Sequence, residues 1–190
     1  MSMASKVLCC NKCNQSANTC MLHQNFQYIF TDLEVKMSTK LGYCHECDHL
    51  SVVEDFDNLD YDISQIQSCS KEAIRKARRS ISIGFTKCMK NWNAAYVKDL
   101  ASHAYLLSIA IKRKGDERCL TCLSRNVTKF EGDIDIPYSI AGCFEGRKKT
   151  GFHHPGCGGE FIVSGSDMRF IISREPIYFK VDDNWYITEA

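Results

Sequence analysis

Cys119-Leu120-Thr121-Cys122 and His154-Pro155-Gly156-Cys157-Gly158-Gly159 are the two short stretches that decide the fold of this 190-residue chain. Each holds a pair of soft ligand side chains separated by two residues, the spacing that tetrahedral zinc sites use. A tight turn over the two intervening residues directs both side chains at one ion. The glycines after Cys157 suit a backbone that takes positive φ and points its N–H groups at the sulfur. The spacing predicts a zinc site formed by Cys119, Cys122, His154 and Cys157.

Two other side chains compete for the fourth position of this site. His153 adjoins His154, but only His154 keeps the two-residue spacing to Cys157. We therefore expect His153 to be exposed or to donate a hydrogen bond to a ligand. Cys143, in Gly142-Cys143-Phe144, is the chief rival, and it would make the site all-thiolate if it replaced His154.

The N-terminal part of the chain contains a second set of paired cysteines. Four thiolates in two pairs of this spacing form a common zinc ribbon, so we expect two zinc ions per chain. Cys20 and His23 also have ligand spacing, and they are the alternative to the later of the two pairs. The predicted ligands of this second site are Cys10, Cys13, Cys44 and Cys47.

The residue after each cysteine pair bears on the turn that a zinc ligand pair needs. Asn14 and Asp48 follow two of the pairs, and both residue types tolerate the left-handed backbone conformation. Leu123 follows Cys122 and does not suit it. We expect Leu123 either to adopt a different turn or to cost about 1 kcal/mol in strain.

The composition of the chain indicates a metal protein of a reducing compartment, the cytoplasm. Twelve of the 190 residues are cysteine, and the formal net charge is +1. Cysteines at metal spacing favour zinc-held thiolates over a disulfide framework. No secretory signal is visible, and the apolar run 104–111 is far too short to span a membrane.

The middle of the chain, residues 64–115, changes to a helical period. Apolar residues recur every three or four positions, which predicts a helical hairpin or a bent helix pair. Gly84 would bend or divide it, and Asn93 is expected to cap the second helix. Lys112-Arg113-Lys114-Gly115 provides the cations and the glycine that favour a helix C-terminus.

This helical segment is strongly basic. It contains eleven lysines and arginines against two acidic residues, a net charge of +9. Such a surface could hold a phosphate backbone, or it could be a solvated face neutralised by the acidic linker before it. The candidate nucleic-acid contacts are Arg75, Arg78 and Arg79.

These patterns predict an α+β protein in which two zinc-ribbon modules with small antiparallel sheets flank the helix pair. The predicted segments are an N-terminal ribbon with an acidic linker (1–63), the basic helices (64–115) and a C-terminal ribbon with an antiparallel meander (116–190). The meander is expected to turn at Gly165-Ser166-Asp167 and again at Asp182-Asp183-Asn184.

At these cysteine pairs the chain resembles the zinc-ribbon (rubredoxin-like) superfamily, over roughly residues 7–53 and 118–163. The stretch 154–159 with a strand behind it is similar to small uncharacterised bacterial proteins that carry this knuckle. The resemblance implies a zinc-binding fold and no particular reaction, since ribbons serve in nucleic-acid binding, in protein docking and as struts inside enzymes.

The sequence favours a binding or adaptor module, held together by structural zinc and contacting protein or nucleic acid. Two alternatives stay open. The cysteine pairs could bind iron or switch between dithiol and disulfide, as redox proteins do. A zinc-dependent enzyme would need an open coordination position, which four available ligands at each site disfavour. No small-molecule substrate and no membrane partner are evident.

Overall fold

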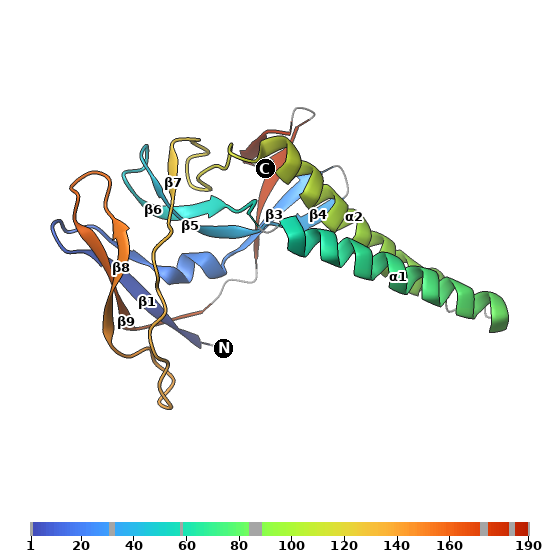
Figure 1. Ribbon diagram of the computed structural model, residues 1–190, viewed down its shortest axis with the longest axis horizontal. Coiled ribbons are helices and arrows are strands. Elements are labelled where there is room, and N and C mark those ends of the chain that lie inside the picture. The colour runs from blue at the N-terminus through green and yellow to red at the C-terminus, as the bar shows by residue number, and fades with distance from the viewer. Residues whose placement is uncertain are drawn as a thin grey trace. The chain divides into compact units, whose positions relative to one another are not determined.

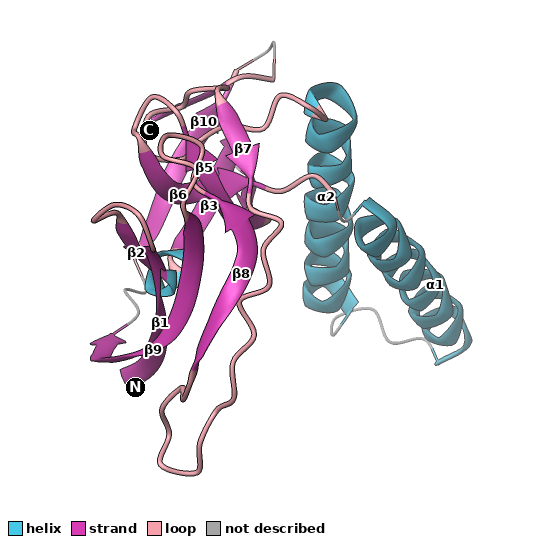
Figure 2. Cartoon of the chain, turned by 60° about the vertical axis from the view of Figure 1, so that its left-hand side comes forward, coloured by secondary structure: helices cyan, strands magenta, loops and turns pink. Residues whose placement is uncertain are grey.

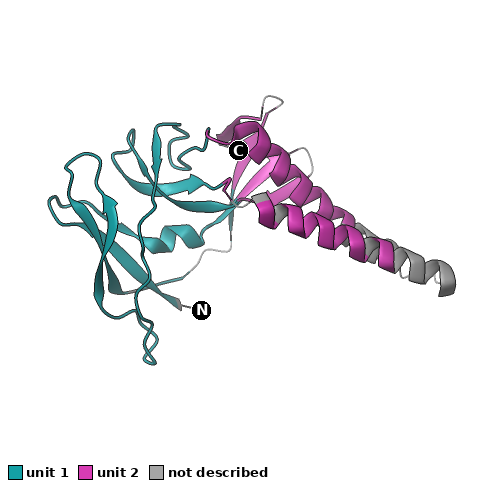
Figure 3. Ribbon diagram, in the orientation of Figure 1, with its two compact units in different colours: residues 1–26, 38–55, 116–177 teal, residues 27–37, 56–115, 178–190 magenta. Residues whose placement is uncertain are grey.

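The computed structural model describes residues 2–30, 33–57, 59–83, 89–171, 175–182 and 185–189. Contacts within the chain divide it into two compact units (Figure 3). Unit 1 comprises residues 1–26, 38–55 and 116–177, and unit 2 comprises residues 27–37, 56–115 and 178–190. The predicted division at residues 63 and 115 differs from this one, because strand pairing joins the N-terminal and C-terminal parts of the chain within unit 1.

The first sheet of unit 1 joins strands from opposite ends of the chain. It is antiparallel, in the order β2-β1-β9-β8 (Figure 1). Its strands are β1 (Ser2–Cys10), β2 (Ser16–Asn18), β8 (Arg147–His153) and β9 (Glu160–Ile171). In the β1–β9 register Cys10 lies opposite Phe161. This pairing brings the end of β1 beside the turn that precedes β9.

The second sheet of unit 1 is a three-stranded antiparallel sheet in the order β6-β5-β7. Its strands are β5 (Thr39–Cys44), β6 (His49–Glu54) and β7 (Val127–Lys129). An isolated bridge also pairs Val53 with Cys119. Cys44 lies opposite Val127 in the β5–β7 register, so the segment around 119–127 lies along this sheet.

Side chains from both sheets share one hydrophobic core. Leu8 and Val163 are fully buried, and Tyr43 and Phe161 are 1% exposed. Burying a side chain of this size stabilises a fold by about 1.5–3 kcal/mol. The buried members of this core are Leu8, Cys10, Leu41, Tyr43, Leu50, Ile136, Phe161 and Val163. Two of them, Cys10 and Tyr43, also belong to the functional region described below. The short 3-10 helix η1 (Thr19–His23) begins beside Asn18, whose side chain accepts from the N–H of Cys20.

Unit 2 is built around the two long helices. α1 (Leu59–Ile83) and α2 (Met89–Arg113) pack along each other (Figure 2). The third sheet has the order β11-β10-β3-β4, with antiparallel pairing between β3 and β4 and between β10 and β11. Its strands are β3 (Asn25–Phe30), β4 (Leu33–Lys36), β10 (Pro176–Val181) and β11 (Ile187–Glu189). Phe30, Tyr105 and Trp185 form an aromatic cluster with ring centroids 4.7–6.3 Å apart.

The structure confirms the predicted α+β class with small antiparallel sheets and a helix pair, and it corrects two details. Asn93 lies inside α2 and does not cap it, since that helix begins at Met89. Gly84 lies outside the described residues. The C-terminal end of α2 follows the prediction: Lys112 and Arg113 occupy its last turn, and Gly115 has a φ of 85°.

Gly165-Ser166-Asp167 is the second correction, because these residues form no hairpin turn. β9 runs through them as one strand, since β1 pairs with it on both sides and a register shift at Ala4/Ser5 absorbs the extra residues. Gly165 is required for another reason. A Cβ there would lie 1.9 Å from the carbonyl oxygen of Phe144, on the hairpin that passes over the strand. At the other predicted turn, β10 pairs with β11 and Asp182 exchanges backbone hydrogen bonds with Trp185 and Tyr186, whereas Asp183 and Asn184 lie outside the described residues.

As far as α1 and α2 are described, neither carries an apolar stretch that would cross a membrane.

Candidate metal centres

Eight cysteine and histidine side chains gather into two groups of four in unit 1. Within each group the ligand atoms all lie within 4.8 Å of one another. The histidine cluster consists of Cys10, Cys13, His154 and Cys157, and the all-cysteine cluster consists of Cys44, Cys47, Cys119 and Cys122. All eight residues are the ones that the sequence singled out.

The pairing of these residues differs from the predicted one. The sequence suggested that Cys10 and Cys13 join Cys44 and Cys47, whereas the structure joins them to His154 and Cys157. The cause is the sheet order. β1 pairs with β9, so the turn after β1 lies beside the turn before β9. β5 pairs with β7 and β6 bridges to Cys119, so the turn between β5 and β6 lies beside the turn at 119–122.

The histidine cluster has the dimensions of a tetrahedral site. The Sγ atoms of Cys10 and Cys157 are 3.4 Å apart, and those of Cys13 and Cys157 are 3.6 Å apart. His154 Nδ1 lies 3.5 Å from Cys13 Sγ and 2.9 Å from Cys157 Sγ. Zinc–sulfur bonds of about 2.3 Å place two tetrahedral sulfurs about 3.8 Å apart, and a sulfur and a nitrogen about 3.6 Å apart. The measured pairs lie closer together than these distances, so a small expansion would bring the four atoms to a zinc coordination shell.

The all-cysteine cluster has similar dimensions. Cys44 and Cys122 have their Sγ atoms 3.4 Å apart, and Cys47 and Cys119 have theirs 3.9 Å apart. Cys44 and Cys119 are fully buried, whereas Cys122 is exposed. This cluster is therefore open to solvent on the side of Cys122.

Each cluster is made from the tips of two tight turns. The Cys10–Cys13 turn connects β1 to β2, and the N–H of Cys10 donates to the carbonyl of Gln15 at 2.9 Å. The His154–Cys157 turn connects β8 to β9 and is closed by the N–H of His154 donating to Gly159 O at 2.6 Å. In the other cluster, Cys44–Cys47 connects β5 to β6, and the 119–122 turn is closed by the N–H of Leu123 donating to Cys119 O at 2.8 Å.

Left-handed residues follow three of these four turns. Asp48 has a φ of 54° and Gly158 a φ of 66°, as suits their residue types. Leu123 adopts a φ of 60° in spite of its side chain, so that turn keeps the geometry and accepts the strain. Asn14 is not among the described residues with positive φ, contrary to expectation.

Hydrogen bonds make the thiols within each cluster unlike one another in pKa. Burial opposes ionisation of Cys10, but the backbone of Lys12 and Cys13 outweighs it and lowers the pKa of Cys10. The backbone of Gln15 favours the Cys13 thiolate, yet burial and the sulfurs of Cys10 and Cys157 raise the pKa of Cys13 to about 11. One sulfur of the cluster is thus disposed to carry the charge and another to keep its proton.

The same division occurs in the all-cysteine cluster. Burial and the neighbouring sulfurs raise the pKa values of Cys44 and Cys47. Burial also opposes ionisation of Cys119, but hydrogen bonds from Ser51 and from the backbone of Thr121 and Cys122 lower its pKa to about 7. Thiols that are hydrogen-bonded to one another in this way would release their protons when a metal ion binds.

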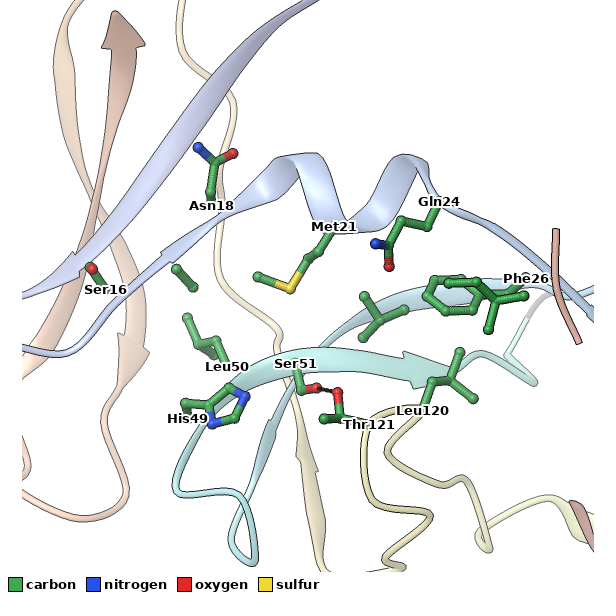
Figure 4. Close-up of a pocket in the computed structure, with 13 residues that line it drawn as sticks. Ser16, Asn18, Met21, Gln24, Phe26, His49, Leu50, Ser51, Leu120 and Thr121 are labelled. Atoms are coloured by element: carbon green, nitrogen blue, oxygen red, sulfur yellow. Dashed lines mark hydrogen bonds between the residues drawn. The ribbon is translucent and has the colours of Figure 1, made fainter. Parts of the chain in front are cut away.

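A polar pair supports Cys119 from outside the cluster. Ser51 Oγ lies 3.3 Å from Cys119 Sγ. It also lies 2.8 Å from Thr121 Oγ1 (Figure 4). Both hydroxyls line a cavity of about 480 Å³ beside β2, η1 and β6, into which Met21 also projects. Serine and threonine here act as hydrogen-bond partners of a ligand, which orients the sulfur.

The rival ligands lie outside both clusters. Among the described residues, no group that could hold a metal includes Cys20, His23, Cys143 or His153. His23 stacks on Phe170 with ring centroids 5.7 Å apart. Cys143 Sγ lies 3.1 Å from Ser139 Oγ in a separate hairpin, and His153 pairs with Glu160 at the end of β8.

Gly159 permits the close packing of the histidine cluster. A Cβ at this position would lie 2.6 Å from Cys10 Sγ and 2.8 Å from Lys12 Cβ. We expect Gly159→Ala to weaken metal binding at the histidine cluster at least about tenfold, because ligand positions must hold within about 0.2 Å. Cobalt titration of the metal-free protein measures it.

Gly158→Ala is the matched control for this substitution. Gly158 has positive φ, but a Cβ there meets nothing within 4 Å. The control should cost about 1 kcal/mol of stability and leave cobalt affinity unchanged. Equal cobalt affinities in the two variants would contradict the steric explanation.

The basic residues of the helices are only partly described. Arg75 is exposed and forms a bidentate ion pair with Glu72, with N–O distances of 2.6 and 2.8 Å. The side chains of Arg78 and Arg79 lie outside the described residues. The predicted nucleic-acid contact of these three arginines stays a prediction.

Comparisons with protein-family models, with curated proteins and with solved structures found no match to this chain.

Proposed function

We propose that this chain is a structural zinc protein that holds two zinc ions in unit 1 and serves as a binding module. The observation that carries this proposal is the geometry of the two clusters, in which eight ligand atoms form two groups at coordination distances. Each group draws two ligands from each of two turns that are far apart in the sequence. A metal ion at either cluster would therefore cross-link two turns that are otherwise held together only by the pairing of their strands.

Zinc is the metal that the ligand sets favour. Three cysteines and one histidine form a common structural zinc site, whereas iron in a rubredoxin-type site is held by four cysteines. The all-cysteine cluster suits either metal, so its assignment to zinc rests on the default for structural ribbons. Purified protein with zinc at both clusters would be colourless, and iron would give visible absorption.

A structural role is favoured over a catalytic one by the number of ligands. A catalytic zinc has three protein ligands and an open position for water or substrate. Each cluster here supplies four ligand atoms, which complete a tetrahedral shell. His154 is 4% exposed, and neither Cys10 nor Cys44 is more than 7% exposed.

The pairing of ligands gives a direct test by zinc counting. Cys13→Ser with Cys157→Ser changes one cluster only, so this variant should retain one zinc per chain. Cys13→Ser with Cys47→Ser damages both clusters and should retain none. Zinc released from the purified, reduced proteins and counted with a chromogenic chelator provides the measurement.

The pairing predicted from the sequence, in which Cys10 and Cys13 join Cys44 and Cys47, gives the opposite result. The first variant would then lose both ions and the second would lose one. Cys20→Ser with Cys143→Ser is the matched control, because both cysteines lie outside the clusters. It should retain two. Two zinc ions retained in every variant would contradict the proposal itself.

Nucleic acid is the partner class that the charge distribution favours. Residues 64–115 carry a net charge of +9. We expect Arg78→Glu with Arg79→Glu to reduce retention of the protein on a DNA column, and the retention of the unchanged protein to fall steeply with salt. Lys6→Glu, outside this segment, is the control. Weak retention at low salt, or retention unaffected by the arginine substitutions, would favour a protein partner.

A further inference from the structure

His154 lies between the histidine cluster and a buried tyrosine. Its Nδ1 faces the sulfurs of Cys13 and Cys157, and its Nε2 lies 2.9 Å from the hydroxyl of Tyr43. His154 is 4% exposed and Tyr43 is 1% exposed. The two rings meet edge to face, with centroids 5.0 Å apart. Solvent therefore has little access to the contact between them.

The direction of this hydrogen bond follows from the next contact. The Tyr43 hydroxyl donates to Oδ1 of Asp48. A phenol has one proton to donate, so the hydroxyl can only accept from His154. The proton of the neutral imidazole then lies on Nε2, and the lone pair of Nδ1 points at the three sulfurs. This is the tautomer that a metal bound at the histidine cluster requires.

Tyr43 and Asp48 belong to the turn that forms the other cluster. Tyr43 immediately precedes Cys44, and Asp48 immediately follows Cys47. The left-handed backbone of Asp48, with a φ of 54°, is set by that turn. A second contact joins the same parts, since the side chain of Gln15, two residues after Cys13, donates to the carbonyl of Asp48.

We propose that Tyr43 and Asp48 couple the two metal sites, so that a metal ion in the all-cysteine cluster raises the affinity of the histidine cluster. This inference rests on the proposed function as a protein with two metal sites. Metal binding orders the 44–47 turn, and this turn holds Tyr43 and Asp48 in place. The hydrogen bond from His154 to Tyr43 then keeps the proton on Nε2, so that the lone pair of Nδ1 is available to the metal. Tyr43 is a positioning residue, because it acts on the metal through His154. Coupling of this kind is reciprocal, so occupancy of the histidine cluster also favours the other.

Cobalt titration of the metal-free, reduced protein tests the positioning role. The two sites differ in their visible spectra, since one has three sulfurs and a nitrogen and the other has four sulfurs. Tyr43→Phe keeps the ring and removes the hydroxyl. It should weaken cobalt binding at the histidine cluster about 10–100-fold, the range for partners of metal-bound histidines. Cobalt binding at the all-cysteine cluster should be unchanged while the histidine cluster is empty, because the coupling acts only when both clusters hold metal.

Tyr138→Phe is the matched control, because this tyrosine also lies in unit 1 and is 61% exposed. It should change neither affinity. Asp48→Gly is a second variant, since glycine accepts the left-handed backbone and lacks the carboxylate. It should weaken the histidine cluster in the same direction. Unchanged cobalt affinity at the histidine cluster in both Tyr43→Phe and Asp48→Gly would overturn the positioning role.

A spectroscopic readout separates positioning from a loss of packing. In the zinc-loaded protein, the ring nitrogen shifts of His154 should show metal on Nδ1 and a proton on Nε2. In Tyr43→Phe the Nε2 proton should lose its protection from exchange with solvent. An Nε2 proton equally protected in both proteins would count against the hydrogen bond.

Coupling itself is tested by a double-mutant cycle. Cys122→Ser, at the exposed ligand of the all-cysteine cluster, should weaken cobalt binding at the histidine cluster about 10–100-fold in the normal chain and hardly at all in the Tyr43→Phe chain. Equal weakening in both backgrounds would overturn coupling through the hydroxyl. If the normal chain bound no cobalt at either cluster, the proposed function would fail; two independent sites would refute the coupling alone.

Discussion

Stripping the metal from the intact, zinc-loaded chain is expected to unfold unit 1. A structural zinc contributes on the order of 10–16 kcal/mol to folding in small zinc peptides. A whole domain is stable by only about 5–15 kcal/mol, so losing even one ion removes most of that margin. The interleaved pairing should make the effect larger, because both clusters lie in unit 1 and both ions would tie that unit together.

Amide spectra of a labelled protein measure this loss region by region. Addition of a strong chelator under reducing conditions should collapse the resonances of β1, β5, β6 and β9. The helical signal in the far ultraviolet should persist in large part, because α1 and α2 belong to unit 2 and have their own contacts. Restoring excess zinc provides the control and should return the spectrum. Resonances of unit 1 that survive chelation would show that the sheets need no metal.

Zinc affinity should fall steeply as the pH is lowered through neutrality. Burial raises the pKa values of Cys44 and Cys47 in the folded chain, and unfolding returns them to the ordinary thiol value above neutrality, so both hold protons at neutral pH in either state. They bind zinc as thiolates and must release those protons. Two released protons imply an affinity that falls at least about 100-fold for each pH unit lost at the all-cysteine cluster, and Cys119, with a pKa of about 7, adds to this fall below neutrality. Cys13, with its pKa raised to about 11, implies at least about tenfold at the histidine cluster.

Competition with a chromophoric chelator at several pH values around neutrality measures the two slopes. The variant Cys44→Ser with Cys47→Ser isolates the histidine cluster and should show the shallower slope. Cys10→Ser with Cys13→Ser isolates the other cluster and should show the steeper one. An affinity independent of pH would mean that the thiols are already ionised before the metal binds, against the effect of their burial.

The sequence identified the ligands because ligand spacing is local. Cys10 and Cys13, like Cys119 and Cys122, must lie on one turn whatever the rest of the chain does. The helix pair was predictable for the same reason, since an apolar period of three or four residues needs only its own segment. The left-handed conformation of Asp48 followed from its residue type and its place after the turn.

Long-range pairing was not predictable from these signals. The grouping of the four turns into two clusters depends on the pairing of β1 with β9. Both strands are apolar runs that could pair with several other strands. Gly165 illustrates the same limit at a single residue. The triplet Gly-Ser-Asp is a good turn by composition, yet here the glycine admits a passing backbone from Phe144. The tyrosine beside Cys44 gave no signal at all, because only the folded chain brings its hydroxyl to His154.

The separation of the paired turns along the chain has a consequence for biosynthesis. Cys13 and Cys157 are 144 residues apart. A ribosome that adds about 5–20 residues per second needs about 7–30 s between them. During that interval Cys10 and Cys13 of the nascent polypeptide lack His154 and Cys157, the residues with which they would share a metal. They stay open to oxidation, or to capture by the wrong cysteines, until the last turn emerges from the exit tunnel.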